Sequence, residues 1–240
     1  MNAAADCNFG AYAILADGRR LGNADVRDAE LIRARHALAY LTAKLGTAAM
    51  LQLLADDLDR TASEVHGWAD TSAGEWQTDT LQLVIAGLKA RAFQDWYADL
   101  VTHDRQLVLR AGHPEHFVNH RMTDDIEVVE NVGETGMPWH IRYHALPEDG
   151  NFPMAWDPDY PVRYGMAILM ENATVGYSMR QSRDTRDGME LLLTTFLPVA
   201  GPAGLAARHL HHLAIEFRNW TRLALADLHE TRRGDADGED

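Results

Sequence analysis

One stretch near the end of the chain decides the fold: Pro202-Ala-Gly-Leu205-Ala-Ala-Arg-His-Leu-His-His-Leu-Ala-Ile-Glu-Phe-Arg-Asn-Trp220-Thr-Arg-Leu-Ala-Leu-Ala-Asp-Leu-His229. Its apolar residues recur at steps of three and four, which is the period of one helix face. This stripe comprises Leu210, Leu213, Phe217, Trp220, Ala224 and Leu228. Pro202 and Gly204 introduce the segment. We therefore expect a long amphipathic helix from Leu205 to about His229, with its stripe buried against another element.

That other element is predicted by the middle of the chain. Residues 80–88 are β-branched and apolar like a strand, and residues 89–102 follow with the pattern of an amphipathic helix. Seven further runs favour strands without another helix between them: residues 106–110, 116–121, 126–132, 139–146, 164–171, 175–183 and 189–198. We expect an α+β fold in which a curved antiparallel sheet grips the long C-terminal helix and encloses a cavity for a small molecule.

The N-terminal part of the chain has a helical pattern. Apolar residues lie at helical spacing over residues 28–66, with a break at Gly46. A polar loop from Asp70 to Asp79 separates these helices from the sheet, and the acidic end of the chain lacks apolar periodicity. We therefore expect three parts: a helical N-terminal region at residues 1–74, a domain formed by the curved sheet and the long helix at residues 75–229, and an acidic, disordered tail at residues 230–240.

Composition narrows the classes of partner. The chain has 240 residues, of which 46% are hydrophobic, enough for a full core. Its formal net charge of −14 repels phosphate backbones and anionic lipid. Residues 50–68 have the outline of a helix-turn-helix, but they offer Glu64 and His66 where a recognition helix needs cations. We expect no nucleic-acid partner.

The sequence also favours a location. Cys7 is the single cysteine and cannot form an internal disulfide, and no basic-then-apolar leader opens the chain. No uninterrupted apolar run reaches the roughly 18 to 20 residues that cross a bilayer. We expect a cytoplasmic protein without a membrane partner. The sequence is compatible with a homodimer as well as with a monomer.

Histidines and carboxylates carry the candidate chemistry. Ten of the twelve histidines follow residue 100. His212 and Glu216 are four residues apart in the final helix, so both stand on one face and could bind one metal ion from a rigid support. The alternative is an exposed His–Glu pair of trivial energy.

Glu130 lies in the run Ile126-Glu-Val-Val-Glu-Asn-Val132. Strict alternation puts it on the face of Ile126, Val128 and Val132, where a carboxylate is a metal ligand, an acid–base group or half of an ion pair, for example with Arg142. One imidazole from His113-Pro-Glu-His116 would complete a set of two histidines and two carboxylates that suits Zn²⁺. The alternative for this segment is a turn with exposed imidazoles.

The motifs occur in the order Phe93-Gln-Asp-Trp-Tyr97, His113-Pro-Glu-His116-Phe-Val-Asn119, Glu130-Asn-Val-Gly133 and His212-x-x-x-Glu216-Phe-x-Asn219. This order resembles that of the 2,4-diacetylphloroglucinol and phloretin hydrolases over about residues 76–228. The resemblance implies the helix-grip fold of the START and Bet v 1 superfamily, and zinc-dependent hydrolysis of the carbon–carbon bond between an acyl group and a phenolic ring. It also implies roles for five residues: His116, Glu130, His212 and Glu216 as zinc ligands, and Asn119 as hydrogen-bond partner of a substrate hydroxyl.

Three residues are candidates for proton transfer. His140 and His144 alternate with apolar residues in Trp139-His-Ile-Arg-Tyr-His144 and so share one strand face, and Tyr177 lies on another predicted strand. The alternative is structural: solvent-facing imidazoles and a cross-strand tyrosine pair.

Together these features favour a zinc-dependent hydrolase that cleaves an acyl–aryl carbon–carbon bond in a phenolic or polyketide-like ketone. The alternative is a START-like binding protein for an apolar small molecule, in which Glu130, His212 and Glu216 form a buried polar network. A ligand-responsive transcription regulator would need DNA affinity that the net charge disfavours.

Overall fold

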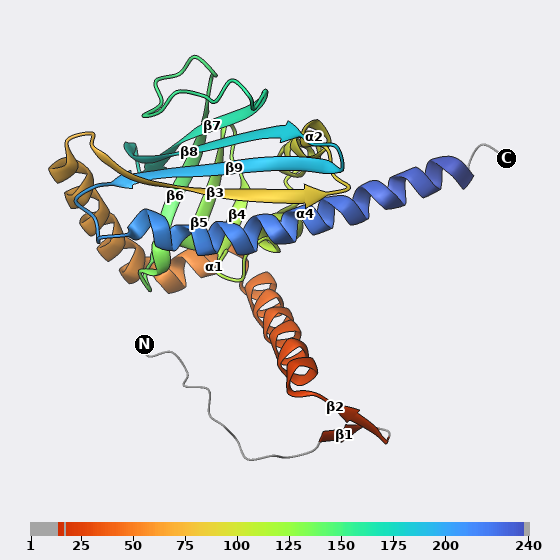
Figure 1. Cartoon of the computed structure of the whole chain (residues 1–240). Coiled ribbons are helices and arrows are strands. Elements are labelled where there is room, and N and C mark those ends of the chain that lie inside the picture. Colours follow the sequence, from red (N-terminus) through yellow and green to blue (C-terminus); the bar gives the residue numbers. More distant parts are fainter. Residues whose placement is uncertain (1–13, 17, 238–240) are drawn as a thin grey trace. The chain divides into compact units, whose positions relative to one another are not determined.

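The computed structural model describes residues 14–16 and 18–237 (Figure 1). The chain divides into two compact units, residues 1–44 and residues 45–240. The first holds the antiparallel pair β1 (Ile14–Ala16) and β2 (Arg19–Leu21) and the beginning of α1 (Asn23–Ser72), which continues into the second. Gly46, with a φ of 70°, interrupts α1, so the predicted helix break is confirmed.

A seven-stranded antiparallel sheet forms the centre of the second unit (Figure 1). Its strands are β3 (Trp76–Ala86), β4 (Val118–Arg121), β5 (Asp125–Asn131), β6 (Pro138–Leu146), β7 (Val162–Met170), β8 (Ala173–Asp184) and β9 (Gly188–Pro198). Their order is β3-β9-β8-β7-β6-β5-β4, so strands β4 to β9 form a meander and β3 pairs with β9. The predicted α+β class is confirmed.

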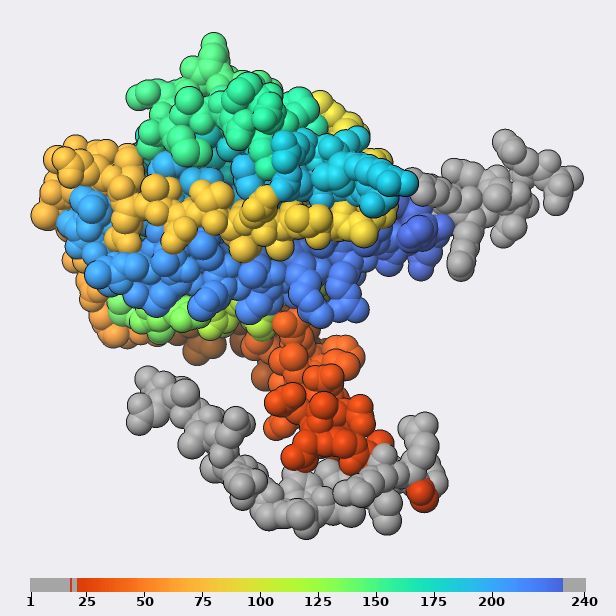
Figure 2. Space-filling view, in the orientation of Figure 1, coloured from red at the N-terminus to blue at the C-terminus, as the bar shows by residue number. Residues whose placement is uncertain are grey.

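The long C-terminal helix α4 (Leu205–Asp237) lies across this sheet (Figure 1). It contacts the edge strand β3 and also η1 (Val132–Glu134), which follows β5 near the other edge. Figure 2 shows the surface of α4, in blue, directly beside that of β3, in yellow. Contacts at both sides of α4 require the sheet to curve around the helix.

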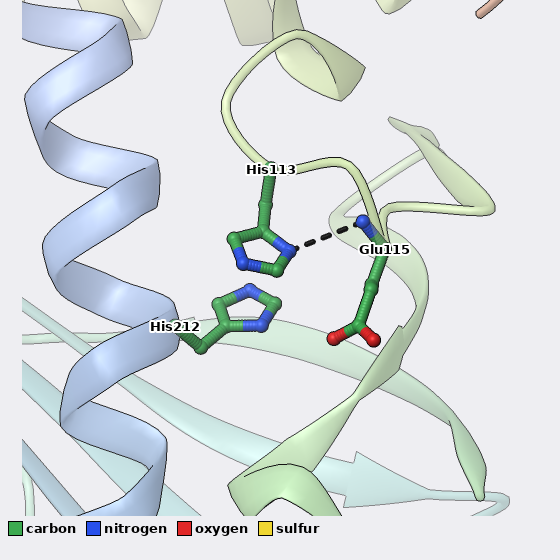
Figure 3. Close-up of side chains that lie close together, drawn as sticks. All are labelled: His113, Glu115 and His212. Atoms are coloured by element: carbon green, nitrogen blue, oxygen red, sulfur yellow. Dashed lines mark hydrogen bonds between the residues drawn. The ribbon is translucent and has the colours of Figure 1, made fainter. Parts of the chain in front are cut away.

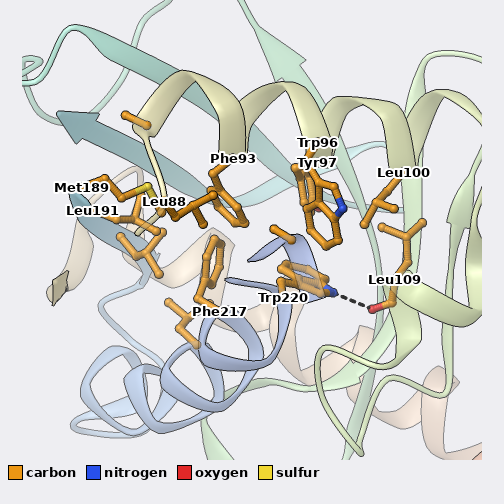
Figure 4. Packing of buried hydrophobic residues seen from close by; sticks show 14 residues of the cluster. Leu88, Phe93, Trp96, Tyr97, Leu100, Leu109, Met189, Leu191, Phe217 and Trp220 are labelled. Atoms are coloured by element: carbon orange, nitrogen blue, oxygen red, sulfur yellow. Dashed lines mark hydrogen bonds between the residues drawn. The ribbon is translucent and has the colours of Figure 1, made fainter. Parts of the chain in front are cut away.

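The two faces of the sheet have different coverings. On the first, called the helix face below, Leu191 and Leu193 of β9 pack with Phe93 of α2 (Ala90–Thr102) and with Phe217 and Trp220 of α4 (Figure 4). On the opposite face, called the outer face, a cluster joins β4 and β5 to the second part of α1, and its buried members are Met50, Leu58, Val118 and Val129. The main core therefore lies between the sheet and helices α2 and α4.

The expected loop from Asp70 to Asp79 is wrong at both ends. Helix α1 continues to Ser72, and β3 begins at Trp76, so residues 73–75 alone connect them. Ala73 and Gly74 have positive φ angles of 48° and 85°, which reverse the chain within this short turn. Tertiary packing extends α1 beyond residue 66, because Trp68 and Ala69 pack against a buried cluster of sheet residues. By compactness the chain divides between residues 44 and 45, whereas the sequence analysis placed a boundary after residue 74.

The expected strand at residues 106–110 is instead the short helix α3 (Gln106–Arg110). The amides of Val108 and Leu109 both bond to the carbonyl of Arg105, as in a helical turn. A run of five residues is too short for its pattern to separate a strand from a buried helical turn.

The expected disordered tail also needs correction, because α4 extends through residues 230–237. Adding a residue to an existing helix gains one hydrogen bond without a new nucleus, so a packed helix can continue into polar sequence. Residues 238–240 lie outside the described part of the chain.

One helix bears on the expectation of no membrane span. Within the described residues, α1 is long and apolar enough to cross a membrane, judged by length and composition alone. One such helix is weak evidence by itself, because a buried helix of a soluble protein or a signal sequence can have the same length and composition, and in this chain 11% of the apolar window is buried. Met50 and Val65 of α1 lie in the buried clusters of the second unit, and the α+β fold is of the soluble type.

Candidate metal centre

Four buried side chains from three parts of the fold converge on the helix face. His116 lies in the turn before β4, Glu130 on β5, and His212 and Glu216 one turn apart on α4. His116 Nε2 is 3.2 Å from His212 Nε2, 3.2 Å from Glu130 Oε2 and 3.5 Å from Glu216 Oε1. His212 Nε2 is 3.2 Å from Glu130 Oε2. The structure thus brings together the four residues that the sequence analysis singled out as ligands.

These separations match the edges of a tetrahedral zinc site. With metal–ligand bonds of about 2.0 to 2.1 Å, tetrahedral geometry places ligand atoms about 3.3 to 3.4 Å apart. The four measured separations lie between 3.2 and 3.5 Å. His116, His212 and Glu216 also satisfy by themselves the spacing of a metal-binding group. The four residues therefore offer two nitrogen and two oxygen donors of the kind that bind zinc, and four of their six donor–donor separations have the length of tetrahedral edges.

Local sequence explains why Glu130 faces this centre. It shares a buried face with Ile126 and Val128, as the alternation predicted. At the end of β5, Gly133 has a φ of 64° and lies so close to α4 that a Cβ there would be 2.4 Å from Leu205 Cδ1. Glycine therefore lets the end of β5 approach the helix that carries the other carboxylate.

The His116 ring is oriented by α3. Its Nδ1 lies 3.3 Å from the carbonyl oxygen of Leu109. If Nδ1–H donates to this carbonyl, the lone pair of Nε2 points toward the other three ligands, as is usual for a metal-binding histidine. Trp220 Nε1 donates to the same carbonyl over 3.2 Å. The element expected to be a strand thus supplies the group that orients His116.

His212 has a different environment. Its ring stacks on His113, with ring centres 3.8 Å apart, and its Nδ1 is buried without a hydrogen-bond partner in the described part of the chain. Figure 3 shows Glu115 beside this pair, and the three residues form a second group with metal-binding spacing. The amide of Glu115 donates to His113 Nδ1 over 3.1 Å. His113 and Glu115 thus extend the cluster beyond the predicted ligands, although the sequence analysis had already noted their motif.

The pKa values of the two carboxyl groups, Glu130 and Glu216, are shifted in opposite directions. Burial opposes ionisation of Glu130, but the charges of His212 and His116 and hydrogen bonds from both rings outweigh it and hold the pKa of Glu130 well below its usual range. Burial raises the pKa of Glu216 to about 8, and repulsion by Glu130 acts in the same direction, while His212 and Arg180 oppose the shift. Without a metal ion, one carboxylate is charged at neutral pH and the other is protonated.

Tyr143 is a neighbour of this centre that sequence reasoning missed. Its hydroxyl donates to Glu130 Oε1 over 3.1 Å. Burial, followed by the negative charge of Glu130, raises the pKa of Tyr143 well above its ordinary value, so the phenol keeps its proton. The signal was present in the alternation of β6, because Tyr143 lies on the face opposite to His140 and His144.

His140 and His144 therefore lie on the outer face and are not brought to the candidate centre. His140 Nε2 is 2.7 Å from Glu127 Oε1, and His144 Nδ1 is 2.7 Å from Asp125 Oδ1. Arg142 shares this face and pairs with Asp125 rather than with Glu130. The alternation correctly placed the two histidines together, but only packing shows that their face lies away from α4.

Tyr177 is also on the outer face. Its ring contacts Trp76 at 5.4 Å and Phe152 at 6.3 Å between ring centres. Arg180 of the same strand faces helices α2 and α4, and the odd spacing between the two puts them on opposite faces. The structure thus gives Tyr177 an aromatic packing role and no place beside the four converging residues.

Asn119 lies on the same sheet face as Glu130. It pairs in register with Val128 of β5, and its side chain is buried. If the strand were regularly extended from His116 onward, Asn119 and His116 would lie on opposite faces of it. However, β4 begins at Val118, so His116 lies in the preceding turn and is not subject to this alternation. Among the residues that the structure describes, none forms a hydrogen bond with the Oδ1 atom of Asn119. A buried acceptor without a partner is costly, so Asn119 is a candidate ligand contact.

Comparison with known proteins gives distant structural neighbours only. No family model matches the chain, and no curated protein matches its sequence. One neighbour among solved structures is an uncharacterized protein from Rhizobium leguminosarum, with 18% sequence identity and a TM-score of 0.36; the match covers 64% of this chain and 96% of that one. A second is the protein XoxI from Bacillus cereus, with 13% identity and a TM-score of 0.37; the match covers 65% of this chain and 98% of that one. Another is the di-domain ARO/CYC StfQ from the steffimycin biosynthetic pathway, with 16% identity and a TM-score of 0.38; the match covers 72% of this chain and 56% of that one.

Proposed function

We propose that this chain is a zinc-dependent hydrolase that cleaves the carbon–carbon bond between an acyl group and a phenolic ring. The observation that carries the proposal is the convergence of His116, Glu130, His212 and Glu216 at separations of 3.2 to 3.5 Å. We further propose that the sheet and α4 form a helix-grip fold of the START and Bet v 1 type, and that the protein acts in the cytoplasm.

The four residues would hold the ion, and neighbouring groups would orient them. When bound, zinc supplies Lewis acidity, which polarises an acyl carbonyl and lowers the pKa of water toward about 7. The Leu109 carbonyl orients His116, and the Tyr143 hydroxyl orients the carboxylate of Glu130. The buried walls around the four residues exclude bulk water and strengthen these interactions.

Asn119 would position the substrate. Its unpaired Oδ1 can accept a hydrogen bond from a phenolic hydroxyl. Ring hydroxyls matter for the reaction, because a phenol can tautomerise to a ketone in which the ring carbon bearing the acyl group carries a proton. Water then adds its hydroxyl group to the acyl carbon, and the ring leaves as a phenol. Aryl ketones without ring hydroxyls should therefore be inert.

One observation favours a second candidate, a START-like carrier of a phenolic or apolar ligand. The three residues expected to transfer protons, His140, His144 and Tyr177, make their contacts on the outer face. Tyr143 is the hydroxyl bonded to the cluster, and its raised pKa makes it a weak acid. A binding protein would need the unpaired Asn119 but no acid–base group.

Elemental analysis and one assay separate these candidates. Protein purified without added chelator should contain about one equivalent of zinc, because a four-residue nitrogen and oxygen site retains the ion. His212→Ala should lose the metal, whereas His211→Ala should keep it, because His211 is an exposed neighbour on the same helix.

The zinc-loaded protein is then incubated with acylated di- and trihydroxybenzenes, and the free acid and deacylated phenol are measured. Tight binding without cleavage would favour the carrier. Metal content that is substoichiometric and unchanged in His212→Ala would overturn the zinc site itself.

A further inference from the structure

Arg180 of β8 is a cation on the helix face without a carboxylate partner. Among the described side chains, no aspartate or glutamate forms an ion pair with it. Arg183, three residues further along the strand and on the outer face, shows the usual arrangement: its Nε donates to Glu190 Oε2 over 2.6 Å. In a chain with 36 acidic residues, an arginine that faces the core without an anion needs an explanation.

Aromatic side chains surround the guanidinium group. Its central carbon lies 4.9 Å from the ring centre of Tyr97 on α2, 5.0 Å from Phe217 on α4 and 5.9 Å from Tyr164 on β7. The positive charge of Arg180 opposes the rise that burial causes in the pKa of Tyr97. These contacts hold the planar group in place and partly offset its loss of hydration, but none of them neutralises its charge.

Arg180 is also close to the candidate metal centre. Phe217, which it contacts, directly follows the candidate ligand Glu216 on α4. Its positive charge acts on both Glu216 and Tyr143. As whole residues, Arg180 and Tyr164 are of intermediate burial although they face the helices.

We propose that Arg180, flanked by Tyr97 and Tyr164, binds an anionic oxygen on the aromatic ring of the substrate, namely an ionised phenol. The identity of this ligand as a phenol rests on the proposed function. Arginine suits the task because its planar, always charged group donates several hydrogen bonds in a fixed geometry. The subsite assigns the substrate a negative charge, whereas Asn119 alone would select a neutral hydroxyl.

The same contact would help the reaction. When water adds its hydroxyl group to the acyl carbon of the ketone tautomer, the bond from that carbon to the ring breaks. Its electron pair moves into the ring and forms a phenolate oxygen, and the remaining proton of water passes to solvent or to that oxygen. A guanidinium group placed at this oxygen stabilises the charge as it develops.

Binding of two uncleavable probes tests the proposal on the full chain as purified. 1,3,5-Trihydroxybenzene has no acyl group to lose and ionises at alkaline pH, and 1,3,5-trimethoxybenzene cannot ionise. Affinities are measured by calorimetry from pH 6 to pH 10 for the natural chain, Arg180→Gln, Arg180→Lys and the matched control Arg183→Gln.

In the natural chain, affinity for the trihydroxy probe should rise as the probe ionises. Arg180→Gln should remove this rise and weaken binding of the ionised probe by about tenfold or more, as expected for a hydrogen bond to a charged group. Arg180→Lys, which keeps the charge but not the planar geometry, should retain part of the rise. Arg183→Gln should match the natural chain, and the trimethoxy probe should not distinguish the variants.

If Arg180→Gln lost affinity for both probes to the same extent, Arg180 would have a structural role and the proposal would be overturned. So would an unchanged pH dependence in Arg180→Gln and Arg180→Lys, or a natural chain that binds neither probe. Because the measurement requires no turnover, a protein that lacks zinc or hydrolysis but shows the arginine-dependent rise would refute the proposed function and leave the anion subsite standing.

Discussion

Zinc binding should release a proton from Glu216, and the amount released should depend on pH. The carboxyl of Glu216 is buried, which raises its pKa to about 8 in the metal-free protein, and the nearby Glu130 adds to the effect. A carboxyl group must ionise to become a ligand. With a pKa of about 8, roughly nine tenths of the Glu216 carboxyl is protonated at pH 7 and about one tenth at pH 9.

Titration calorimetry of the metal-free protein with zinc, in two buffers of different ionisation enthalpy, measures this release. We expect Glu216 to contribute about 0.9 proton at pH 7 and about 0.1 proton at pH 9. Glu130 should contribute almost none, because the pKa of that carboxyl is already well below its usual range. Glu216→Gln should eliminate the difference between the two pH values, and His211→Ala should preserve it.

Two results would refute this reasoning. The first is a proton release that is the same at pH 7 and at pH 9, because the buried carboxyl would then not titrate between them. The second is a pH-dependent release that persists in Glu216→Gln, because another group would then be its source. Either result would remove Glu216 from the ligand set and leave His116, Glu130 and His212 to be tested separately.

Three further predictions concern stability. The ionised form of Glu130 contributes stability above the unfolded pKa of about 4.5, so the metal-free protein should lose it as pH falls below that value, and urea unfolding should show no such loss in Glu130→Gln. Gly133→Ala should cost about 1 to 3 kcal/mol in the same assay, because the new Cβ would clash with α4, whereas Gly136→Ala, with open space around it, should cost less. A chain of residues 75–240 should fail to fold by circular dichroism, and residues 45–240 should fold, because the second part of α1 belongs to the core.

Local periodicity was sufficient to predict most of the secondary structure. The apolar stripe of α4, the alternation of β5 and the break at Gly46 each depend on residues close together in the chain, and the structure confirms them. The same local rules placed His212 and Glu216 on one helix face. These predictions succeed because the periods of 3.6 and 2 residues are properties of the backbone itself.

Tertiary packing decided the rest. Alternation showed that His140 and His144 share a face of β6, but not that Tyr143 points toward α4, because only the curvature of the sheet decides which face the helix covers. The five residues of α3 fit either a strand or a helical turn, and their contacts with α2 and β4 select the turn. Arg180 is an ordinary strand residue in the sequence, and its unpaired charge emerges only when Tyr97 and Phe217, from two separate helices, pack around it. Contacts of this kind depend on how helices and strands that are far apart in the sequence pack together, and local periodicity contains no information about that packing.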